Sequence, residues 1–163
     1  MRVERWMSSP ALTVTPDIPA SLALRKMMEH EIRRLPVVDD DGDLVGLVTD
    51  RDLRQVLLPH LIPRQDEPYE SADGDLPVGK VMRRAVPVVR PSDSIRDATE
   101  LLHNRKMTGL PVVQGRRCVG VITVQDIMEI FLVALDRHAA ALEEDFAEVQ
   151  TKPGTVEKKE VPR

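Results

Sequence analysis

The sequence predicts an α/β protein made of two tandem copies of one small unit. Residues 46–53 read Gly-Leu-Val-Thr-Asp-Arg-Asp-Leu and return in the same pattern as residues 120–127, Gly-Val-Ile-Thr-Val-Gln-Asp-Ile. Residues upstream of both stretches also repeat at one constant spacing. In each copy, apolar runs of strand length alternate with stretches of helical periodicity. Such a duplication indicates that each copy is one supersecondary unit.

Further landmarks extend the duplication over most of the chain. The strand sequence Leu-Pro-Val-Val at residues 35–38 returns at residues 110–113, and the turn that follows is one residue shorter in the second copy. Other matched pairs are Met7 and Met82, Pro16 and Pro91, and Gly46 and Gly120. A copy of this size buries little core alone, so we expect the two copies to pair face to face through their sheets.

Each copy is expected to contain, in order, a strand, a helix, two strands that form a hairpin, and a second helix. A short helical turn leads into each copy. The elements before the signature are residues 13–15, 19–30 and 35–38 in the first copy and residues 86–89, 94–104 and 110–113 in the second. The periodicity predicts these inward-facing residues: Leu22, Met27 and Met28 in the first long helix, and Ile95, Ala98, Leu101 and Leu102 in the second.

The expected boundaries follow from these elements. Repeat 1 covers residues 1–58 and repeat 2 covers residues 78–133. Residues 59–77 contain prolines, acids and a glycine, which predicts an exposed linker loop. Helical periodicity outlasts the second copy and predicts a helix extension over residues 134–151, whose apolar stripe we expect to contribute to a homodimer. A charged tail with prolines, residues 152–163, is predicted to be disordered.

The signature Gly-x-x-Thr-x-x-Asp has two interpretations. A strand delivers Thr49 or Thr123 to the start of a helix, where unpaired N–H groups suit a phosphate. Asp52 or Asp126, one turn later, can accept hydrogen bonds from two neighbouring hydroxyls, such as those of a ribose. The same spacing also predicts a capping box, in which the threonine and the acid only satisfy the helix terminus.

Composition narrows the function classes. Hydrophobic residues make up 42% and charged residues 31%, which is ordinary for a globular protein. Aromatic residues make up only 2%, the net charge is −4 and the pI is about 5.6, so nucleic-acid binding is not favoured. Neither a signal peptide nor an apolar run of membrane-spanning length is recognised, and a cytoplasmic location without membrane contact is the expectation.

Other chemical constellations are weak. Asp39, Asp41 and Asp43 suggest a calcium loop, but Leu44 stands where such a loop needs glycine, so no metal site is expected. The histidines lack metal-ligand spacing, and no nucleophile with a base can be assembled, so we expect no enzyme and no catalytic cofactor. The single cysteine, Cys118, is expected to be a buried apolar residue. The arginines best placed to reach a phosphate are Arg34, Arg51 and Arg90.

The duplicated pattern resembles the cystathionine β-synthase domain family, usually called CBS domains. The matching features are the Thr-Val-x-Pro strand, the Leu-Pro-Val-Val strand and the Gly-x-x-Thr-x-x-Asp signature, in this order and in both copies. The resemblance covers nearly all of residues 1–133 and is closest to bacterial stand-alone CBS pairs. It implies two β-α-β-β-α repeats related by a pseudo-twofold axis, with two clefts between them, and dimerisation of the pair.

The resemblance also implies a ligand and its site. CBS pairs typically bind adenosine-containing ligands such as AMP, ADP, ATP or S-adenosylmethionine. Asp52 and Asp126 correspond to the residues that hold ribose hydroxyls, and Thr49 and Thr123 to those that meet the phosphate. Arg34 is among the residues expected at the ligand, as an arginine placed to reach the phosphate. The strand residues expected to sandwich the adenine are Thr13, Thr15, Leu35, Pro36, Val37, Val88, Arg90, Leu110, Pro111 and Val112.

Three functions remain open on the sequence. The leading one is a regulatory, ligand-sensing module that signals to an unidentified partner protein by a change in conformation or assembly. The second is a structural dimerisation module with empty clefts, which capping boxes would permit. The third is a transcription-linked regulator. The two copies differ at matched positions. Arg51 of the first copy corresponds to Gln125 of the second, and Arg34 corresponds to Gly109, so the clefts are expected to differ in affinity.

Overall fold

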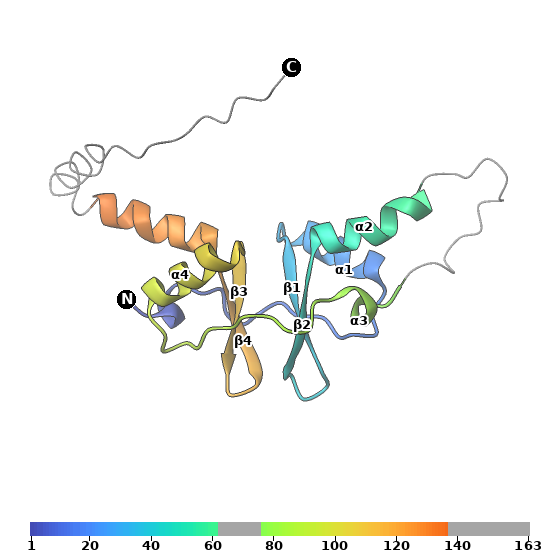
Figure 1. Ribbon diagram of the computed structural model, residues 1–163, viewed down its shortest axis with the longest axis horizontal. Helices are drawn as coiled ribbons and strands as arrows, with labels where there is room; N and C mark the ends of the chain where they lie inside the picture. Colours follow the sequence, from blue (N-terminus) through green and yellow to red (C-terminus); the bar gives the residue numbers. More distant parts are fainter. Residues whose placement is uncertain (62–75, 137–163) are drawn as a thin grey trace, which may run out of the picture. The chain divides into compact units, whose positions relative to one another are not determined.

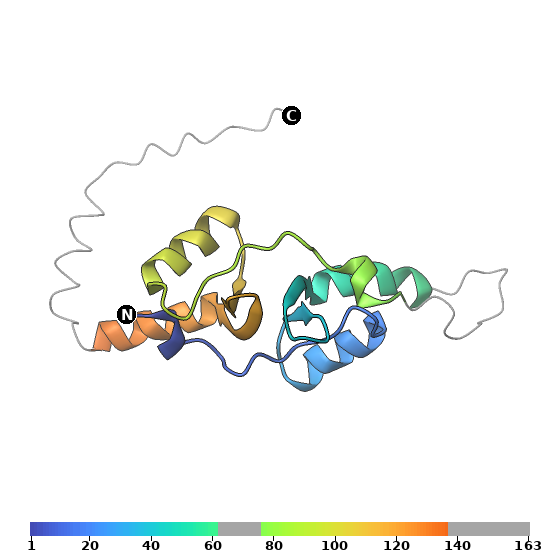
Figure 2. The same ribbon diagram turned by 90° about the horizontal axis from the view of Figure 1, so that it is seen from below.

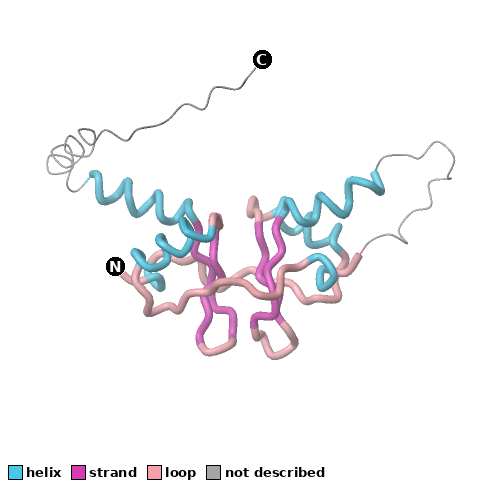
Figure 3. Tube along the Cα trace, in the orientation of Figure 1, coloured by secondary structure: helices cyan, strands magenta, loops and turns pink. Residues whose placement is uncertain are grey.

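The computed structural model describes residues 1–61 and 76–136, and it confirms the predicted α/β class (Figure 1). Two antiparallel β-hairpins each stand beside their own helices (Figure 3). The predictions for most of the linker, for the tail and for the end of the C-terminal helix lie outside the described residues. The chain divides into two compact units, Met1–Ile127 and Met128–Arg163, and both signatures and both hairpins belong to the first.

The two hairpins have the same register. Strand β1 (Arg34–Val38) pairs with β2 (Leu44–Thr49), and β3 (Gly109–Gln114) pairs with β4 (Arg117–Thr123). Each ladder shifts register at the second valine of the Leu-Pro-Val-Val sequence. Each turn contains one glycine with a positive φ, +82° at Gly42 and +67° at Gly115, a conformation that glycine adopts without strain. The turns also touch, because Leu44 donates to the Arg116 carbonyl at 2.9 Å.

The helices lie in the predicted segments, but the buried face of α1 differs in part from the predicted one. Helix α1 (Ala20–Glu29) begins after Pro19, and α4 (Ile95–Arg105) begins after Ser94, whose hydroxyl accepts from the Asp97 amide at 3.0 Å. Helix α2 (Asp50–Leu61) follows the first signature, and residues 124–136 are helical after the second. No helix among the described residues is long and apolar enough to cross a membrane.

The predicted inward face of α1 was partly wrong. Met27 is buried, but Leu22 is 38% and Met28 64% exposed, and the small residues Ala20 and Ala23 are buried instead. Alanine at the contact lets the helix lie close to the hairpin, so the longer side chains on either side remain near solvent. In α4 the prediction holds for Ile95, Ala98 and Leu102, while Leu101 is half-buried.

The predicted strands at residues 13–15 and 86–89 are reduced to single bridges. Val14 pairs in parallel with Val37, and Val89 pairs with Val112. Each bridge carries two hydrogen bonds; for Val14 these join its amide to the Pro36 carbonyl at 3.1 Å and its carbonyl to the Val38 amide at 2.9 Å. The ladder stops there because the neighbouring prolines lack the N–H group that would continue it.

The short helical turn at the start of each copy packs on the other copy. The 3₁₀ turn η1 (Val3–Arg5) donates from the Val3 amide to the Asp93 carbonyl at 3.0 Å. Helix α3 (Val78–Val81) donates from the Val78 amide to the Ile18 carbonyl at 2.9 Å. The segments that continue from these turns then cross to their own copies, as Figure 2 shows. The repeats therefore hold each other by exchanged segments.

The signature glycines lie where these exchanged segments cross. A Cβ atom on Gly46 would stand 2.9 Å from the Arg83 carbonyl oxygen and 2.6 Å from the Met82 sulfur. A Cβ atom on Gly120 would stand 2.9 Å from the Ser8 carbonyl oxygen and 2.8 Å from the sulfur of Met7. Real Cβ atoms do not approach carbonyl oxygens this closely. Glycine is therefore required for the close approach of the two backbones.

An aliphatic core fills each repeat, as the scarcity of aromatic residues predicts. In the first repeat α1 contacts α2, and both contact the hairpin and α3. Cys118 lies half-buried in β4, where burial raises the pKa of its thiol to about 11 and keeps it protonated at neutral pH. The side chains buried in the core of the first repeat include Met27, Leu35, Val37, Val48, Leu53 and Val78.

Gly46→Ala and Gly120→Ala are each expected to lower the free energy of unfolding by about 1–3 kcal/mol, the usual cost of overpacking. Chemical denaturation followed by circular dichroism measures the change. The matched control is Gly115→Asn, because nothing lies within 4 Å of a Cβ there and asparagine tolerates the positive φ. If both alanine variants unfold at the same denaturant concentration as the control, the crossing does not depend on glycine.

Candidate functional site

The second signature forms a reciprocal capping box. The Thr123 amide and hydroxyl both donate to Oδ2 of Asp126, at 2.6 and 2.7 Å, and the Asp126 amide donates to the Thr123 hydroxyl at 3.3 Å. One carboxylate oxygen is thus committed to the helix terminus. The other oxygen, Oδ1, receives no hydrogen bond from the residues that the structure describes. Capping therefore leaves half of the carboxylate available to a ligand, and the two interpretations of the signature are compatible.

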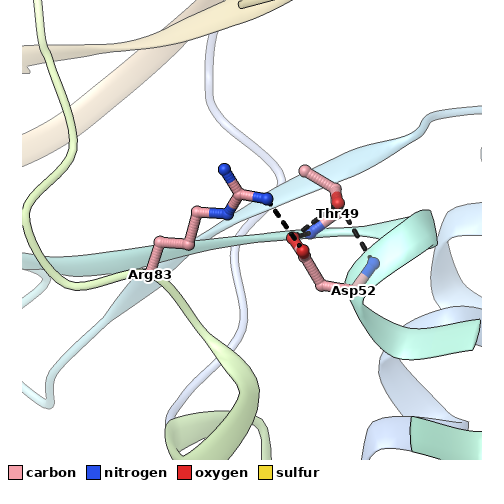
Figure 4. Close-up of polar contacts among 3 residues, drawn as sticks. All are labelled: Thr49, Asp52 and Arg83. Carbon is pink, nitrogen blue, oxygen red and sulfur yellow. Dashed lines mark hydrogen bonds and ion pairs between the residues drawn. The ribbon is translucent and has the colours of Figure 1, made fainter. Parts of the chain in front are cut away.

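The first signature forms the same box with an additional partner. The Thr49 amide and hydroxyl donate to Oδ2 of Asp52 at 3.1 and 2.6 Å. The second oxygen, Oδ1, accepts from Nη2 of Arg83 at 3.1 Å (Figure 4). Partial burial raises the pKa of Asp52, but the hydrogen bonds from Thr49 and Arg83 outweigh it and hold the pKa below its usual value. Both oxygens of Asp52 are therefore occupied within the protein.

A cleft of about 710 Å³ opens beside the second signature. Its volume lies within the range of small-molecule sites. Most of its lining comes from the segment that leads into repeat 1, the residues up to the start of β1 and the start of the helix after β4. The lining residues are Ser8, residues 10–12, residues 30–34, Thr108, Val121 and residues 123–125. Asp126 is not among the lining residues, but it is hydrogen-bonded to Thr123, which lines the cleft.

Arg34 brings positive charge into this cleft. Its Nη2 donates to the Thr108 hydroxyl at 2.6 Å, and its Nη1 is buried without a hydrogen-bond partner among the described residues. A Cβ on Gly109, the position equivalent to Arg34 in repeat 2, would lie only 1.7 Å from Nη1. Only one arginine fits at this point between the copies. Burial lowers the pKa of Arg34, Asp50 and Asp126 oppose this shift, and the guanidinium stays charged.

The remaining predicted site residues are distributed unevenly. The side chains of the two Leu-Pro-Val segments, predicted to sandwich an adenine, are fully buried in the cores and do not line the cleft. Thr13 lines a second cavity of about 500 Å³ beside the hairpin turns, and Thr15 is hydrogen-bonded to Asp17. Val88 is 38% exposed and Arg90 is exposed. Arg51 is exposed in the first turn of α2.

Several lining residues were missed by sequence reasoning. The segment of residues 8–12 carries no motif of its own, and Ile32 and Thr108 lie just before the two repeated Leu-Pro-Val-Val strands, outside the repeated pattern. Arg83 was missed because it, like residues 8–12, belongs to no motif. The signal that could have found them is the match of Met7 with Met82, because it places Ser8 and Arg83 at equivalent positions of the duplication.

Metal binding has no support in the described part of the chain. No group of three or more His, Cys, Asp or Glu residues lies together there. The acidic turn after β1 has another role, since the Asp39 carboxylate accepts from the amides of Asp41 and Asp43 at 3.2 and 2.9 Å. These hydrogen bonds fix the hairpin turn.

Comparison with known proteins identifies the family. The CBS domain pattern matches residues 3–59 and 78–133. The CBS domain-containing protein DDB_G0289609 of Dictyostelium discoideum is 29% identical over 82% of this chain and 93% of its own length.

Two solved CBS structures are also similar. The CBS domain pair of protein MJ0100, in complex with 5-methylthioadenosine and S-adenosyl-L-methionine, is 26% identical with a TM-score of 0.68, over 80% of this chain and 95% of that one. CBSX2 in complex with AMP is 30% identical with a TM-score of 0.67, over 82% and 97% of the two chains. Two matched repeats with the same architecture show that this chain belongs to the CBS domain family as a tandem CBS pair.

Proposed function

We propose that this CBS pair is a regulatory module that binds an adenosine-containing ligand in the cleft beside Asp126. The observation that carries the proposal is the half-committed carboxylate of Asp126. Its Oδ2 caps the helix through Thr123, which lines a cleft of about 710 Å³, and its Oδ1 has no partner among the described residues. A single carboxylate oxygen can accept hydrogen bonds from both hydroxyls of a ribose.

The other groups of the cleft suit the remaining parts of such a ligand. Arg34 lines the cleft with a charged guanidinium, which favours a phosphate or carboxylate. The start of the helix after Thr123 adds backbone N–H groups that favour negative charge. Leu12 and Ile32 supply apolar surface against which an adenine ring can lie. The exposed site residues Arg51 and Arg90 remain proposed phosphate contacts.

The similar structures support this class of ligand. One holds 5-methylthioadenosine and S-adenosyl-L-methionine, and the other holds AMP. All three ligands contain adenosine, while only AMP carries a phosphate. The proposal for this chain is therefore an adenosine-containing regulatory ligand, without catalysis by the module itself. The repeats hold each other by exchanged segments. A ligand bound between them would shift the populations of the conformations of the pair, and a regulated partner protein could respond to this shift.

A structural module with empty clefts is the second candidate. It is favoured by the capping boxes, because both helix termini are satisfied without any ligand. Dimerisation is compatible with either function. The apolar residues Met128, Phe131 and Leu132 are 53%, 40% and 58% exposed on the helix of the second unit. We propose that this helix contributes to a homodimer interface.

Isothermal titration calorimetry with AMP, ATP and S-adenosylmethionine tests the ligand, after any co-purified ligand has been removed. A ligand at about 100 times its Kd is expected to stabilise the protein by about 2.7 kcal/mol per site. Asp126→Asn is expected to weaken binding in its cleft about tenfold or more, because one charged acceptor is lost. Asp97→Asn, in the first turn of α4 next to the Ser94 cap, is the matched control and should bind normally. Absence of binding by the wild type across the panel would favour the structural module.

Truncation after Leu132 tests the assembly. If the helix contributes to the interface, the truncated protein is expected to dissociate to a monomer at a higher concentration than the full chain, because apolar contact area is lost. Light scattering over a dilution series measures the change. An unchanged dissociation profile would remove the helix after Leu132 from the interface.

A further inference from the structure

We propose that Arg83 makes the two ligand sites chemically unequal. At the Asp126 site the nucleoside alone can bind, whereas at the Asp52 site it must displace the Arg83 guanidinium from the carboxylate. A ligand that carries a phosphate can compensate this displacement, because the released guanidinium then pairs with the phosphate. The inference rests on the proposed function and adds to it a residue that determines ligand selectivity.

The first step is the equivalence of Arg83 and Ser8. Arg83 exchanges two backbone hydrogen bonds with Leu47, both at 2.9 Å, on the strand of the first signature. Ser8 exchanges two with Val121, at 2.9 and 3.0 Å, on the strand of the second. Leu47 and Val121 each follow the signature glycine directly. The two residues therefore occupy the same place in the two halves of the molecule and differ in side chain.

The second step is what each side chain does at the carboxylate. The 71% exposed side chain of Arg83 reaches Oδ1 of Asp52 at 3.1 Å. Ser8 lines the cleft beside the second signature, where Oδ1 of Asp126 has no donor among the described residues. Since Oδ2 is committed to the cap in both copies, Oδ1 is the oxygen left for ribose hydroxyls. Arg83 therefore occupies Oδ1 of Asp52. At the equivalent place in the other copy, Ser8 leaves Oδ1 of Asp126 without a donor from the described residues.

The third step is that this ion pair can exchange. Exposed ion pairs contribute little stability, so the guanidinium can leave Asp52 when another anion competes for it. A phosphate is the stronger partner, because arginine binds it through two parallel hydrogen bonds. Arg51 adds charge of the same sign in the first turn of α2, where the second copy has the neutral Gln125. The Asp52 site is therefore selective for phosphorylated ligands.

Calorimetry with adenosine and AMP tests the inference on matched variants. Arg83→Ser copies the residue of the other repeat, and Arg84→Ser removes the neighbouring arginine, which has no contact with Asp52. Both are combined with Asp126→Asn, so that the Asp52 site is observed nearly alone. Arg83→Ser is expected to tighten adenosine binding about threefold to tenfold relative to Arg84→Ser, since the competing donor is gone. Arg83→Ser is also expected to reduce the ratio of AMP affinity to adenosine affinity by at least the same factor.

A ligand-free measurement keeps the test independent of binding. Arg83→Ser should raise the pKa of the Asp52 carboxyl, measured by carbon-13 NMR, while Arg84→Ser should leave it unchanged. The reverse swap, Ser8→Arg, should weaken adenosine at the Asp126 site about threefold to tenfold in a protein of unchanged melting temperature.

Equal adenosine affinities and an equal Asp52 pKa in the two serine variants would overturn the inference while the proposed function stands. Failure of the wild type to bind either ligand would overturn both. A tightened AMP site in Arg83→Ser, with its preference over adenosine retained, would also contradict the role given to Arg83.

Discussion

The fold depends on the close backbone contact between each signature strand and the segment that leads into the opposite repeat. Arg83 pairs with Leu47, and Ser8 pairs with Val121, through two hydrogen bonds each. Gly46 and Gly120 permit the approach because a Cβ would meet a carbonyl oxygen at 2.9 Å. Each leading segment is continuous in sequence with one repeat but packs on the other. The two repeats therefore depend on each other for their structure. This exchange also carries residues 8 and 83 to the two sites, where they set the local chemistry.

The capped aspartate explains how one motif serves both folding and binding. A helix terminus needs an acceptor for its first N–H groups, and the threonine with Oδ2 of the aspartate provides it in each copy. The cap holds the carboxylate in a fixed position, so in the proposed function its second oxygen would bind a ligand without further loss of side-chain freedom. Within the capped signature itself, the repeats differ at that second oxygen, which has a donor from Arg83 in the first copy and none among the described residues in the second.

The sequence alone predicts the hairpins, the helices and the capping boxes, because period and spacing encode local structure directly. It does not predict which repeat a leading segment packs on, since Val3 and Val78 have the same pattern whichever partner they meet. The Leu-Pro-Val segments were expected at the ligand, but their uninterrupted apolar character places both faces of the strand in the core. The strands around Val14 and Val89 shrink to bridges because flanking prolines remove donors. The match of Met7 with Met82 pairs Arg83 with Ser8, but the contact of Arg83 with Asp52 follows only from the crossing geometry.

The central claim is that an adenosine-containing ligand binds beside Asp126, and amide NMR during an AMP titration tests it most directly. The account predicts saturable shifts for the amides of Ser8, Ala11, Leu12, residues 31–34 and residues 123–125, which line the cleft. These shifts should be lost first in Asp126→Asn. Saturable shifts confined to residues 38–42 and 117–119, which line the cavity beside the hairpin turns, or no shifts at all, would contradict it.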